Sequence, residues 1–552
     1  MEMKRIFLFA CVVFSSVAVF SQFRLNADLL KLNNVFSAIT NLYVDSVDEK
    51  KLVETAIVAT LKDLDPHSSY IPKEEVEKLN EPLEGSFEGV GIQFQIFNDT
   101  ILVVQTITDT PAEKVGVKPG DRIVYIDGEL IAGQKIQNSD VTKRLRGKKG
   151  SEVEVKILRR GVPELILFKI IRDKIPVNSI DASYMIDKEI GYIKINNFGS
   201  KTIDEYKTAF FALKKEGMKH LILNLQGNGG GYLNAAIELA DEFLGRDKLI
   251  VYTEGLKQRR MTSTATAIGG FEQGKLIILV DEYSASASEI VSGAVQDWDR
   301  GIIIGRRTFG KGLVQRQISL SDGSMLRLTT SRYYTPSGRS IQKPYKDGVE
   351  KYRKDLADRY EHGEMQHIDS IHFSDSLKYT TNVLKRTVYG GGGIMPDVFI
   401  PLDTTRFTDF HRKIVAQGIM NKIVVQYNDR NRDSLKRKYR DFEQYKNTFS
   451  IDNTDLLNQM KAMAEQEGIV YNEEQYNQSK DLISLQLKAL IARDIWSMNE
   501  YYRIMDVENE ALQRAIYILR NPDEYSQILS NNLEYETLIS EFAPHEPGPR
   551  NP

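Results

Sequence analysis

The chain has 552 residues, of which 41% are hydrophobic and 27% charged, and its formal net charge is −3 at pH 7. This length predicts several domains with sizeable apolar cores. The balance of charges argues against a nucleic-acid partner, because proteins that bind nucleic acid usually carry a basic excess. The single cysteine, Cys11, lies near the start, so the remaining chain cannot form disulfides, thiol nucleophiles or cysteine-zinc sites.

Residues 1–21 have the layout of a secretory signal peptide. Lys4 and Arg5 precede an apolar run at residues 6–20, and small or polar residues follow it. The 15 residues of this run are fewer than the ~20 that a membrane-spanning helix needs. We therefore expect an exported protein of the periplasm or cell envelope. An uncleaved segment that holds the chain at the membrane is the alternative.

The next two regions differ in their hydrophobic pattern and in their glycine content. Residues 22–82 predict helices, because apolar side chains recur at helical spacing until Pro66 interrupts the pattern. Residues 83–172 instead predict a small β-rich module of short strands and glycine turns. The expected strands are 101–107, 123–126 and 152–158, and the expected helices are 112–117 and 139–145.

Residues 173–402 alternate between strand and helix patterns, which predicts an α/β core. The expected strands are 190–195, 221–225 and 276–280, and the expected helices are 201–215, 233–243 and 288–298. Residues 344–388 are polar and aromatic without a clear period and are interpreted as an insertion. Residues 403–552 predict a helical C-terminal extension with a proline-rich, disordered tail.

A run of serines and alanines at residues 284–288 lies where a predicted apolar strand gives way to a helix. A serine at such a junction can point into a cleft, and the N–H groups of the helix N-terminus can hold an oxyanion. Serines at this place also make good helix caps, which is the alternative. None of the seven histidines lies in a motif that pairs with the run, and no Gly-x-Ser-x-Gly sequence exists.

Lysine is the other common base for a serine, provided that burial keeps its amine neutral. Lys311 lies between Gly310 and Gly312, so the backbone of another segment can approach it closely. Gln315 follows on a predicted strand, and its amide oxygen can orient an amine without adding charge. The alternative is a surface lysine in a glycine turn.

Two segments have part of the spacing of a cofactor site, and neither has all of it. Residues 305–311 have phosphate-loop spacing, but Gly312 replaces the required Ser or Thr, and a strand pattern follows instead of a helix. His362, His367 and His372 recur every five residues and so cannot share one helix face. We expect no metal, nucleotide or other cofactor.

Four stretches in the same order give the chain a family resemblance. They are residues 64–68 (LDPHS), 283–290 (YSASASEI), 308–315 (TFGKGLVQ) and 328–338 (LTTSRYYTPSG). With them the chain resembles the carboxy-terminal processing proteases, which are serine peptidases with a Ser/Lys dyad and a PDZ domain. The similarity runs from about residue 31 to residue 401.

The resemblance implies a role for each matching residue. Ser286 would be the nucleophile, Lys311 the general base, and Gln315 the residue that orients the lysine. The backbone N–H groups of Gly230 and Ala287 would hold the oxyanion. The chain departs from the family at residues 226–231, where it has Gln-Gly-Asn-Gly-Gly-Gly and the family often has Arg-Asn-Asn-Pro-Gly-Gly.

The resemblance also implies a crotonase-like α/β core with the PDZ domain inserted at residues 83–172. Gly89, Val90, Gly91 and Ile92 fit the loop that binds a peptide carboxylate, and a bound peptide would add a strand beside it. A second departure is Arg306, where the family often has an acidic residue.

Together these features predict an endopeptidase that recognises protein C-termini or apolar tails and cleaves peptide bonds. Its expected partners are protein and peptide substrates, with an adaptor or self-association through the helical terminal regions. A non-catalytic PDZ scaffold with a vestigial protease core is the rival hypothesis, which the joint presence of Ser286, Lys311 and Gln315 disfavours.

Overall fold

The computed structural model describes residues 27–530, and the predicted signal at 1–21 lies outside them. The chain divides into two compact units, residues 1–70 and 71–552. In the first unit, α2 (Ala27–Leu42) and α3 (Glu49–Lys62) are the described helices. Within residues 27–530 no helix is both long and apolar enough to cross a membrane.

The PDZ module lies in the second unit and consists of a six-stranded antiparallel sheet with order β3-β4-β5-β7-β8 and β6 beside β5. Its strands are β3 (Ile92–Phe97), β4 (Thr100–Thr106), β5 (Arg122–Ile126), β6 (Glu129–Leu130), β7 (Glu152–Leu158) and β8 (Ile166–Ile171). Two helices, α5 (Pro111–Lys114) and α6 (Asn138–Leu145), pack on this sheet around one apolar cluster. The pair β2 (Ser86–Gly89) and β9 (Asp173–Pro176) joins the chain entering and leaving the module.

A second six-stranded sheet, with order β10-β11-β12-β15-β16-β21, forms the centre of the α/β core. Its strands are β10 (Ile180–Met185), β11 (Ile190–Ile195), β12 (His220–Asn224), β15 (Leu276–Val280), β16 (Ile302–Gly305) and β21 (Val398–Phe399). All pairs are parallel except β10 with β11. Both faces of β11 and β15 are buried, which a parallel sheet requires when helices cover it on both sides.

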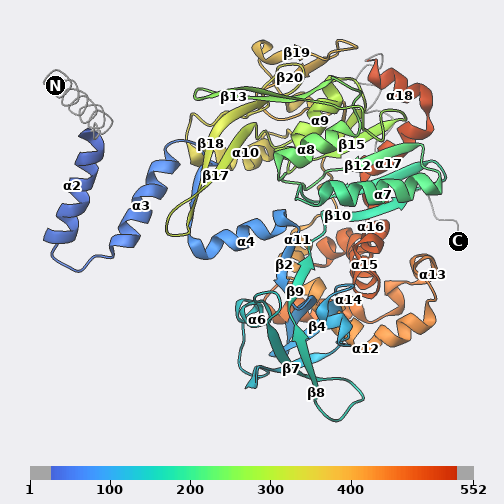
Figure 1. Ribbon diagram of the computed structural model, residues 1–552. Coiled ribbons are helices and arrows are strands. Elements are labelled where there is room, and N and C mark those ends of the chain that lie inside the picture. Colours follow the sequence, from blue (N-terminus) through green and yellow to red (C-terminus); the bar gives the residue numbers. More distant parts are fainter. Residues whose placement is uncertain (1–26, 531–552) are drawn as a thin grey trace, which may run out of the picture. The chain divides into compact units, whose positions relative to one another are not determined.

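The two faces of this sheet are covered by helices from different parts of the chain (Figure 1). On one face lie α7 (Thr202–Glu216), α8 (Leu233–Asp241) and α9 (Ala287–Asp297). On the other face lie α17 (Glu510–Arg520) and α18 (Pro522–Leu529), drawn in red in Figure 1. The end of the predicted C-terminal extension is therefore a layer of the α/β core itself.

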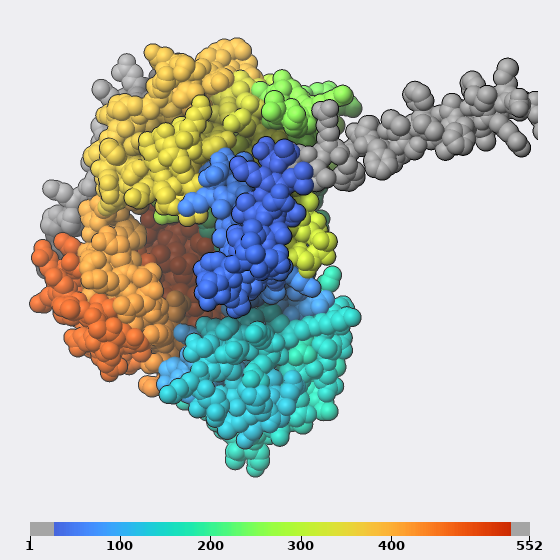
Figure 2. Space-filling view, turned by 90° about the vertical axis from the view of Figure 1, so that its left-hand side faces the viewer, coloured from blue at the N-terminus to red at the C-terminus, as the bar shows by residue number. Residues whose placement is uncertain are grey.

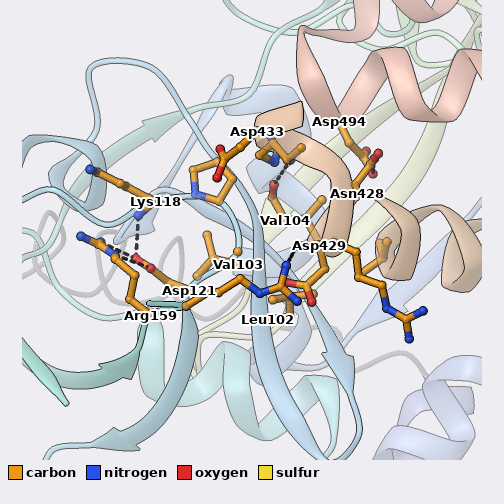
Figure 3. Close-up of a pocket in the computed structure, with 16 residues that line it drawn as sticks. Leu102, Val103, Val104, Lys118, Asp121, Arg159, Asn428, Asp429, Asp433 and Asp494 are labelled. Carbon is orange, nitrogen blue, oxygen red and sulfur yellow. Dashed lines mark hydrogen bonds and ion pairs between the residues drawn. The ribbon is translucent and has the colours of Figure 1, made fainter. Parts of the chain in front are cut away.

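The earlier part of that extension has a separate apolar core. It consists of α11 (Asp409–Ala416), α12 (Ile419–Lys438), α13 (Phe442–Thr448), α14 (Leu456–Gln466) and α15 (Glu473–Ile495), after which α16 (Met498–Met505) leads back to the sheet. The PDZ module lies beside these orange helices (Figure 2). Arg122 of β5 and Asp429 of α12 form an ion pair at 2.7 Å, and Arg432 donates to the Val104 carbonyl at 3.0 Å. Val104, Asp429 and Arg432 line a pocket of about 280 Å³ between the module and these helices (Figure 3).

A smaller sheet packs against the core, in which β13 (Leu249–Gly255) lies between β14 (Gln258–Thr264) and β18 (Met325–Tyr334), and β17 (Leu313–Ser319) pairs with β18. The predicted insertion at 344–388 contains the helix α10 (Val349–Glu361) and the hairpin of β19 (Lys378–Thr380) and β20 (Thr387–Tyr389). The sequence gives no sign of this helix.

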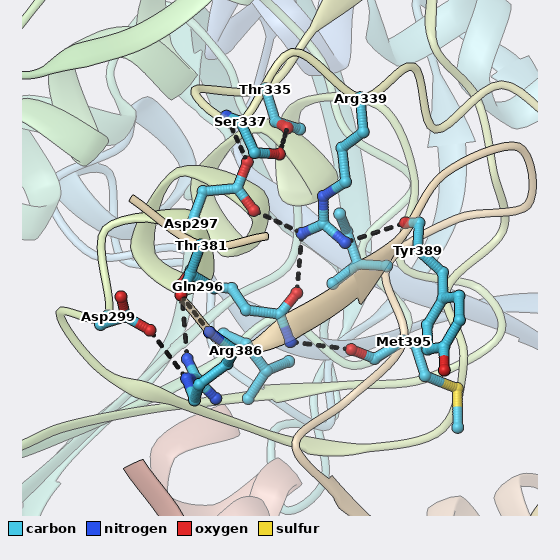
Figure 4. Close-up of polar contacts among 12 residues, drawn as sticks. Gln296, Asp297, Asp299, Thr335, Ser337, Arg339, Thr381, Arg386, Tyr389 and Met395 are labelled. Atoms are coloured by element: carbon cyan, nitrogen blue, oxygen red, sulfur yellow. Dashed lines mark hydrogen bonds and ion pairs between the residues drawn. The ribbon is translucent and has the colours of Figure 1, made fainter. Parts of the chain in front are cut away.

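Buried ion pairs join the region of this insertion to the end of α9 (Figure 4). The Arg339 guanidinium lies 2.7 Å from a carboxylate oxygen of Asp297, and both side chains are fully buried. Arg386 pairs with Asp299 at 2.7 Å and with Asp397 at 2.6 Å. These charges compensate one another. Removing either arginine therefore leaves a buried carboxylate without its cationic partner.

Candidate active site

The three serines at the junction of β15 and α9 make different contacts. Ser284 donates to the Leu225 carbonyl at 2.8 Å, and Ser288 donates to the Asn228 carbonyl at 2.9 Å. Both side chains are fully buried, whereas Ser286 is partly exposed. Ser284 and Ser288 therefore brace the neighbouring glycine loop, which leaves Ser286 as the serine that a substrate can reach.

Ser286 adopts a backbone conformation that non-glycine residues rarely occupy, with φ +55° and ψ −110°. It directly precedes α9, so the first N–H groups of the helix lie next to it. Such strain persists only where surrounding contacts fix the backbone, and it concentrates at functional sites. The conformation supports the prediction that Ser286 has a chemical role.

Lys311 lies on the loop between β16 and β17, where Gly310 has φ +87°. A side chain on Gly312 would lie 3.0 Å from the backbone nitrogen of Gln342, so the predicted close approach of backbone to this loop is confirmed. A strand, β17, follows the lysine, as the sequence predicts. The loop is therefore not the strand-loop-helix arrangement that binds phosphate.

Glu289, which sequence reasoning missed, joins the serine turn to the lysine loop. Its Oε2 accepts the backbone N–H groups of Ser286 at 2.8 Å and of Lys311 at 2.9 Å. Its Oε1 accepts the Thr308 hydroxyl at 2.6 Å and the Gly310 N–H at 2.7 Å. One fully buried carboxylate thus fixes the backbone of both predicted catalytic residues. The Ser-x-x-Glu spacing of a helix capping box was the available signal.

Burial raises the pKa of Glu289, and the four hydrogen bonds that it accepts act in the opposite direction.

Tyr333 of β18 also links the serine turn to the lysine loop. Its hydroxyl lies 2.7 Å from the Lys311 carbonyl and 3.1 Å from the Ser286 carbonyl. Because this tyrosine is also buried, the two backbone segments are held in one rigid arrangement.

The glycine loop at residues 226–231 lies against the serine turn. A Cβ on Gly230 would lie only 2.8 Å from the Ser286 Cβ and 2.9 Å from the Ala287 nitrogen, so only glycine fits there. The Gly230 N–H itself donates to the Asn228 side chain at 2.8 Å. Its predicted role as an oxyanion donor therefore requires this bond to be exchanged. The Ala287 N–H belongs to the first residue of α9.

Gln315 and Arg306 lie at the edges of this site. The Gln315 amide nitrogen donates to the Thr329 hydroxyl at 3.3 Å, which fixes the side chain across the β17–β18 pair. The predicted role of Gln315 needs its amide oxygen to face the lysine amine. Arg306 pairs with the buried Glu282 at 2.7 Å, so its charge is compensated.

The predicted carboxylate loop of the PDZ module lies between β2 and β3. The Gly91 carbonyl accepts the Ile107 N–H at 3.0 Å, and the Val90 carbonyl accepts the Ala112 N–H at 2.9 Å. In a trans peptide the N–H points away from the carbonyl. The N–H groups of Gly91 and Ile92 therefore point away from the segment that these two carbonyls bind. Gly91 has φ +85°, and a Cβ there would lie 2.3 Å from Thr110. Glycine is therefore required at this position.

Residues 27–530 contain no group of three or more His, Cys, Asp or Glu side chains placed to hold a metal ion. The His362 ring donates from Nδ1 to the Asp358 carbonyl at its own helix end, at 2.6 Å.

Sequence profiles of known families match four parts of the chain. Peptidase family S41 matches residues 189–351, and a PDZ domain matches residues 89–170. The N-terminal domain of the activating protease CtpB matches residues 16–75. A family of unknown function (DUF8443) matches residues 410–497.

Individual relatives agree with these matches. The carboxy-terminal-processing protease of Bartonella bacilliformis is 40% identical over 319 residues, which are 57% of this chain and 72% of that protein. The carboxy-terminal processing protease CtpB of Bacillus subtilis is 34% identical over 325 residues, 58% of this chain and 66% of that protein. A probable CtpA-like serine protease of Staphylococcus aureus is 36% identical, and the chain spans 63% of its length.

Among solved structures, the photosystem II D1 C-terminal processing protease is 31% identical with a TM-score of 0.32, covering 55% of this chain and 82% of that one. The extent and identity of the sequence matches are sufficient to assign the family. The chain belongs to peptidase family S41, the carboxy-terminal processing serine proteases, and carries their PDZ domain.

Proposed function

We propose that this protein is an endopeptidase in which Ser286 attacks the peptide bond and Lys311 acts as the general base. The observation that carries the proposal is the buried Glu289 carboxylate, which accepts a backbone N–H from each of these two residues at 2.8 and 2.9 Å. A structural role for Glu289 alone would not require a strained, partly exposed serine at the same junction.

In the proposed reaction, the neutral Lys311 amine takes the proton of the Ser286 hydroxyl. The Ser286 oxygen then forms a bond to the substrate carbonyl carbon, and the carbonyl electrons move to its oxygen. When this tetrahedral intermediate collapses, the peptide C–N bond breaks and the lysine returns the proton to the leaving amine. Water then hydrolyses the ester by the same two proton transfers, which regenerates the serine.

The oxyanion needs backbone donors beside Ser286. The Ala287 N–H at the start of α9 is one, aided by the partial positive charge of the helix N-terminus. Gly230 supplies the second after its N–H leaves the Asn228 side chain, to which it donates at 2.8 Å. Each donor of this kind lowers the barrier by roughly 3 kcal/mol in comparable sites. Gln315 keeps its proposed role of orienting the lysine amine. No metal or nucleotide enters these steps.

The PDZ module supplies substrate selection in this proposal. Its strand β3 lies at the edge of the sheet, so a peptide can pair with it as an added strand. The peptide's terminal carboxylate would then meet the N–H groups of the loop formed by Gly89, Val90, Gly91 and Ile92. Protein C-termini and apolar tails fit this mode of binding.

Three further expectations belong to the proposal. The α/β core would have the crotonase-like arrangement of its family, which the helix-covered parallel sheet supports. The first 21 residues would direct export to the periplasm or cell envelope, with membrane attachment if they are retained. The helical terminal regions would mediate self-association or bind an adaptor.

The direct test is the digestion of unfolded casein by the purified chain, with products identified by mass spectrometry. Ser286→Ala should abolish the cleavage. Ser292→Ala is the matched control, since its hydroxyl donates only to the Ser288 carbonyl one turn along α9, at 2.8 Å. Equal cleavage by the Ser286→Ala variant and the wild type would refute the proposal.

A further inference from the structure

The C-terminal helices contact the active-site loop as well as the back of the sheet. Asn509 is the N-cap of α17, and its side-chain oxygen accepts the Leu512 N–H at 3.2 Å. The nitrogen of the same amide donates to Oε1 of Gln226 at 2.8 Å. Gln226 is the first residue of the glycine loop, 283 positions earlier in the chain.

Gln226 is fixed through its side chain and its backbone. Asn224 donates to the Gln226 side chain at 3.2 Å and accepts the Gln226 N–H at 2.8 Å. The Lys194 amine, on the buried strand β11, donates to the Gln226 carbonyl at 2.9 Å. The next residue, Gly227, donates its N–H to Asp281 at 2.9 Å. The start of the loop is therefore held by polar contacts from β11, β12 and the residue after β15, in addition to the contact from Asn509.

The rest of the loop depends on such contacts because its own sequence gives it little stiffness. Gly227, Gly230 and Gly231 have φ of +74°, +99° and +154°. Glycine adopts positive and negative φ about equally well, so these residues do not fix the loop by themselves. Gly230 then lies against Ser286. Between Gln226 and Gly230 lies Asn228, whose carbonyl accepts the Ser288 hydroxyl at 2.9 Å and whose side chain accepts the Gly230 N–H at 2.8 Å. A shift at Gln226 therefore reaches the serine turn through this residue.

We infer that Asn509 is a positioning residue for the glycine loop, so that the C-terminal segment after residue 497 completes the active site. This inference rests on the proposed function, because the loop is assigned there as the holder of the oxyanion. The apolar face of α17 supplies the rigid base: it packs on β12, β15 and β16 through Ala511, Leu512, Ala515, Ile518 and Leu519. The hydrogen bond from Asn509 then holds the Gln226 side chain at a fixed place relative to α17.

The test separates positioning from helix capping by replacing Asn509 with serine. Serine caps a helix about as well as asparagine, but its side chain is too short to reach Gln226. We expect the melting temperature to stay close to that of the wild type. The kcat for casein should fall about 10- to 100-fold with little change in KM, as expected when a transition-state contact is misplaced by up to about 1 Å.

Asn521→Ser is the matched control. Asn521 also precedes a C-terminal helix, but its amide donates to the Tyr517 carbonyl within α17, at 2.7 Å, and its side chain is exposed. A wild-type kcat for a stably folded Asn509→Ser variant would overturn the inference. If that variant proves unstable, Gln226→Ala serves instead, because it removes the acceptor of the Asn509 amide and leaves the cap of α17 intact. Gln226→Ala should show the same loss of kcat, about 10- to 100-fold, and a wild-type kcat would also overturn the inference.

Failure of this inference differs from failure of the proposed function. Ser286→Ala and Lys311→Met are measured in the same assay. If both abolish cleavage and Asn509→Ser does not change it, only the positioning role is wrong. If Ser286→Ala retains activity, the proposed function is wrong and the inference falls with it.

Discussion

Replacing Glu289 with glutamine tests the link between the serine turn and the lysine loop. The carboxylate accepts two hydrogen bonds on each oxygen, at 2.8 and 2.9 Å on Oε2 and at 2.6 and 2.7 Å on Oε1. Glutamine keeps one accepting oxygen and presents an NH₂ group on the other side. The NH₂ group can face Thr308, whose hydroxyl also accepts, but the Gly310 N–H then loses its acceptor.

The magnitude follows from these contacts. One buried N–H without a partner costs about 1–3 kcal/mol, and the three remaining bonds lose their charge, at about 1 kcal/mol each. Burial raises the pKa of Glu289, so removing the buried charge offsets part of this loss. We expect the free energy of unfolding to fall by about 3 kcal/mol, which a domain with about 5–15 kcal/mol of stability survives.

Activity should fall further than stability. The loosened loop carries Lys311, and a misplacement of about 1 Å costs about 100-fold in rate. The assay is urea unfolding followed by the fluorescence of the two tryptophans, Trp298 and Trp496, combined with kcat and KM for casein. Glu238→Gln is the control because Glu238 is exposed on α8. The reasoning is refuted if Glu289→Gln keeps the kcat of the wild type, or if only KM changes.

The remaining predictions concern pH, buried charge and the PDZ contact. Burial raises the pKa of Asp506 from 3.8 to about 6, so its protonated form stabilises the fold, and that stability is lost as the pH rises through 6. Asp506→Asn should remove a pH dependence of about 3 kcal/mol between pH 4 and 7 in urea unfolding, and an unchanged slope would contradict the assignment. Arg339→Met should destabilise the protein by about 3–5 kcal/mol in the same assay, because it leaves Asp297 buried without its partner. Asp429→Asn should speed hydrogen exchange in β4 and β5, because it removes the ion pair with Arg122; unchanged exchange would show that this contact does not hold the PDZ module.

Exposed pairs provide matched controls for two of these predictions. Lys351→Met breaks a surface ion pair with Asp347 at 2.6 Å and should leave the free energy of unfolding nearly unchanged, because solvent screens exposed charges. A cost comparable to that of Arg339→Met would show that burial is not the cause. Asp173→Asn removes an exposed pair with Lys149 where the chain leaves the PDZ module, and it should leave exchange in β4 and β5 unchanged.

The central strands are the part of the fold that the sequence predicts best. The predicted strands at 190–195 and 276–280 have the bounds of β11 and β15, because strands buried on both faces read as unbroken apolar runs. The sequence pattern does not predict the helix α10, because one of the residues on its buried face is Arg359. Arg359 donates to the Arg307 and Thr308 carbonyls. A charged residue on the buried face removes the apolar period that predicts a helix.

The roles of Glu289 and the last helices could not be predicted for a different reason. A carboxylate in a capping box is common, and its contacts to Lys311 and Gly310 lie 22 and 21 residues away, beyond any local pattern. The apolar face of α17 predicts that the helix is buried on one side, but it does not identify the sheet on which the helix packs. Contacts between segments that are distant along the chain need coordinates.

The most direct test of the account is a double-mutant cycle between Ser286→Ala and Lys311→Met in casein cleavage. If the two side chains act as one unit, each single variant loses nearly all activity, and the double variant is no worse than either of them. Cleavage by Lys311→Met at the wild-type rate would contradict the account, whatever the serine variant does.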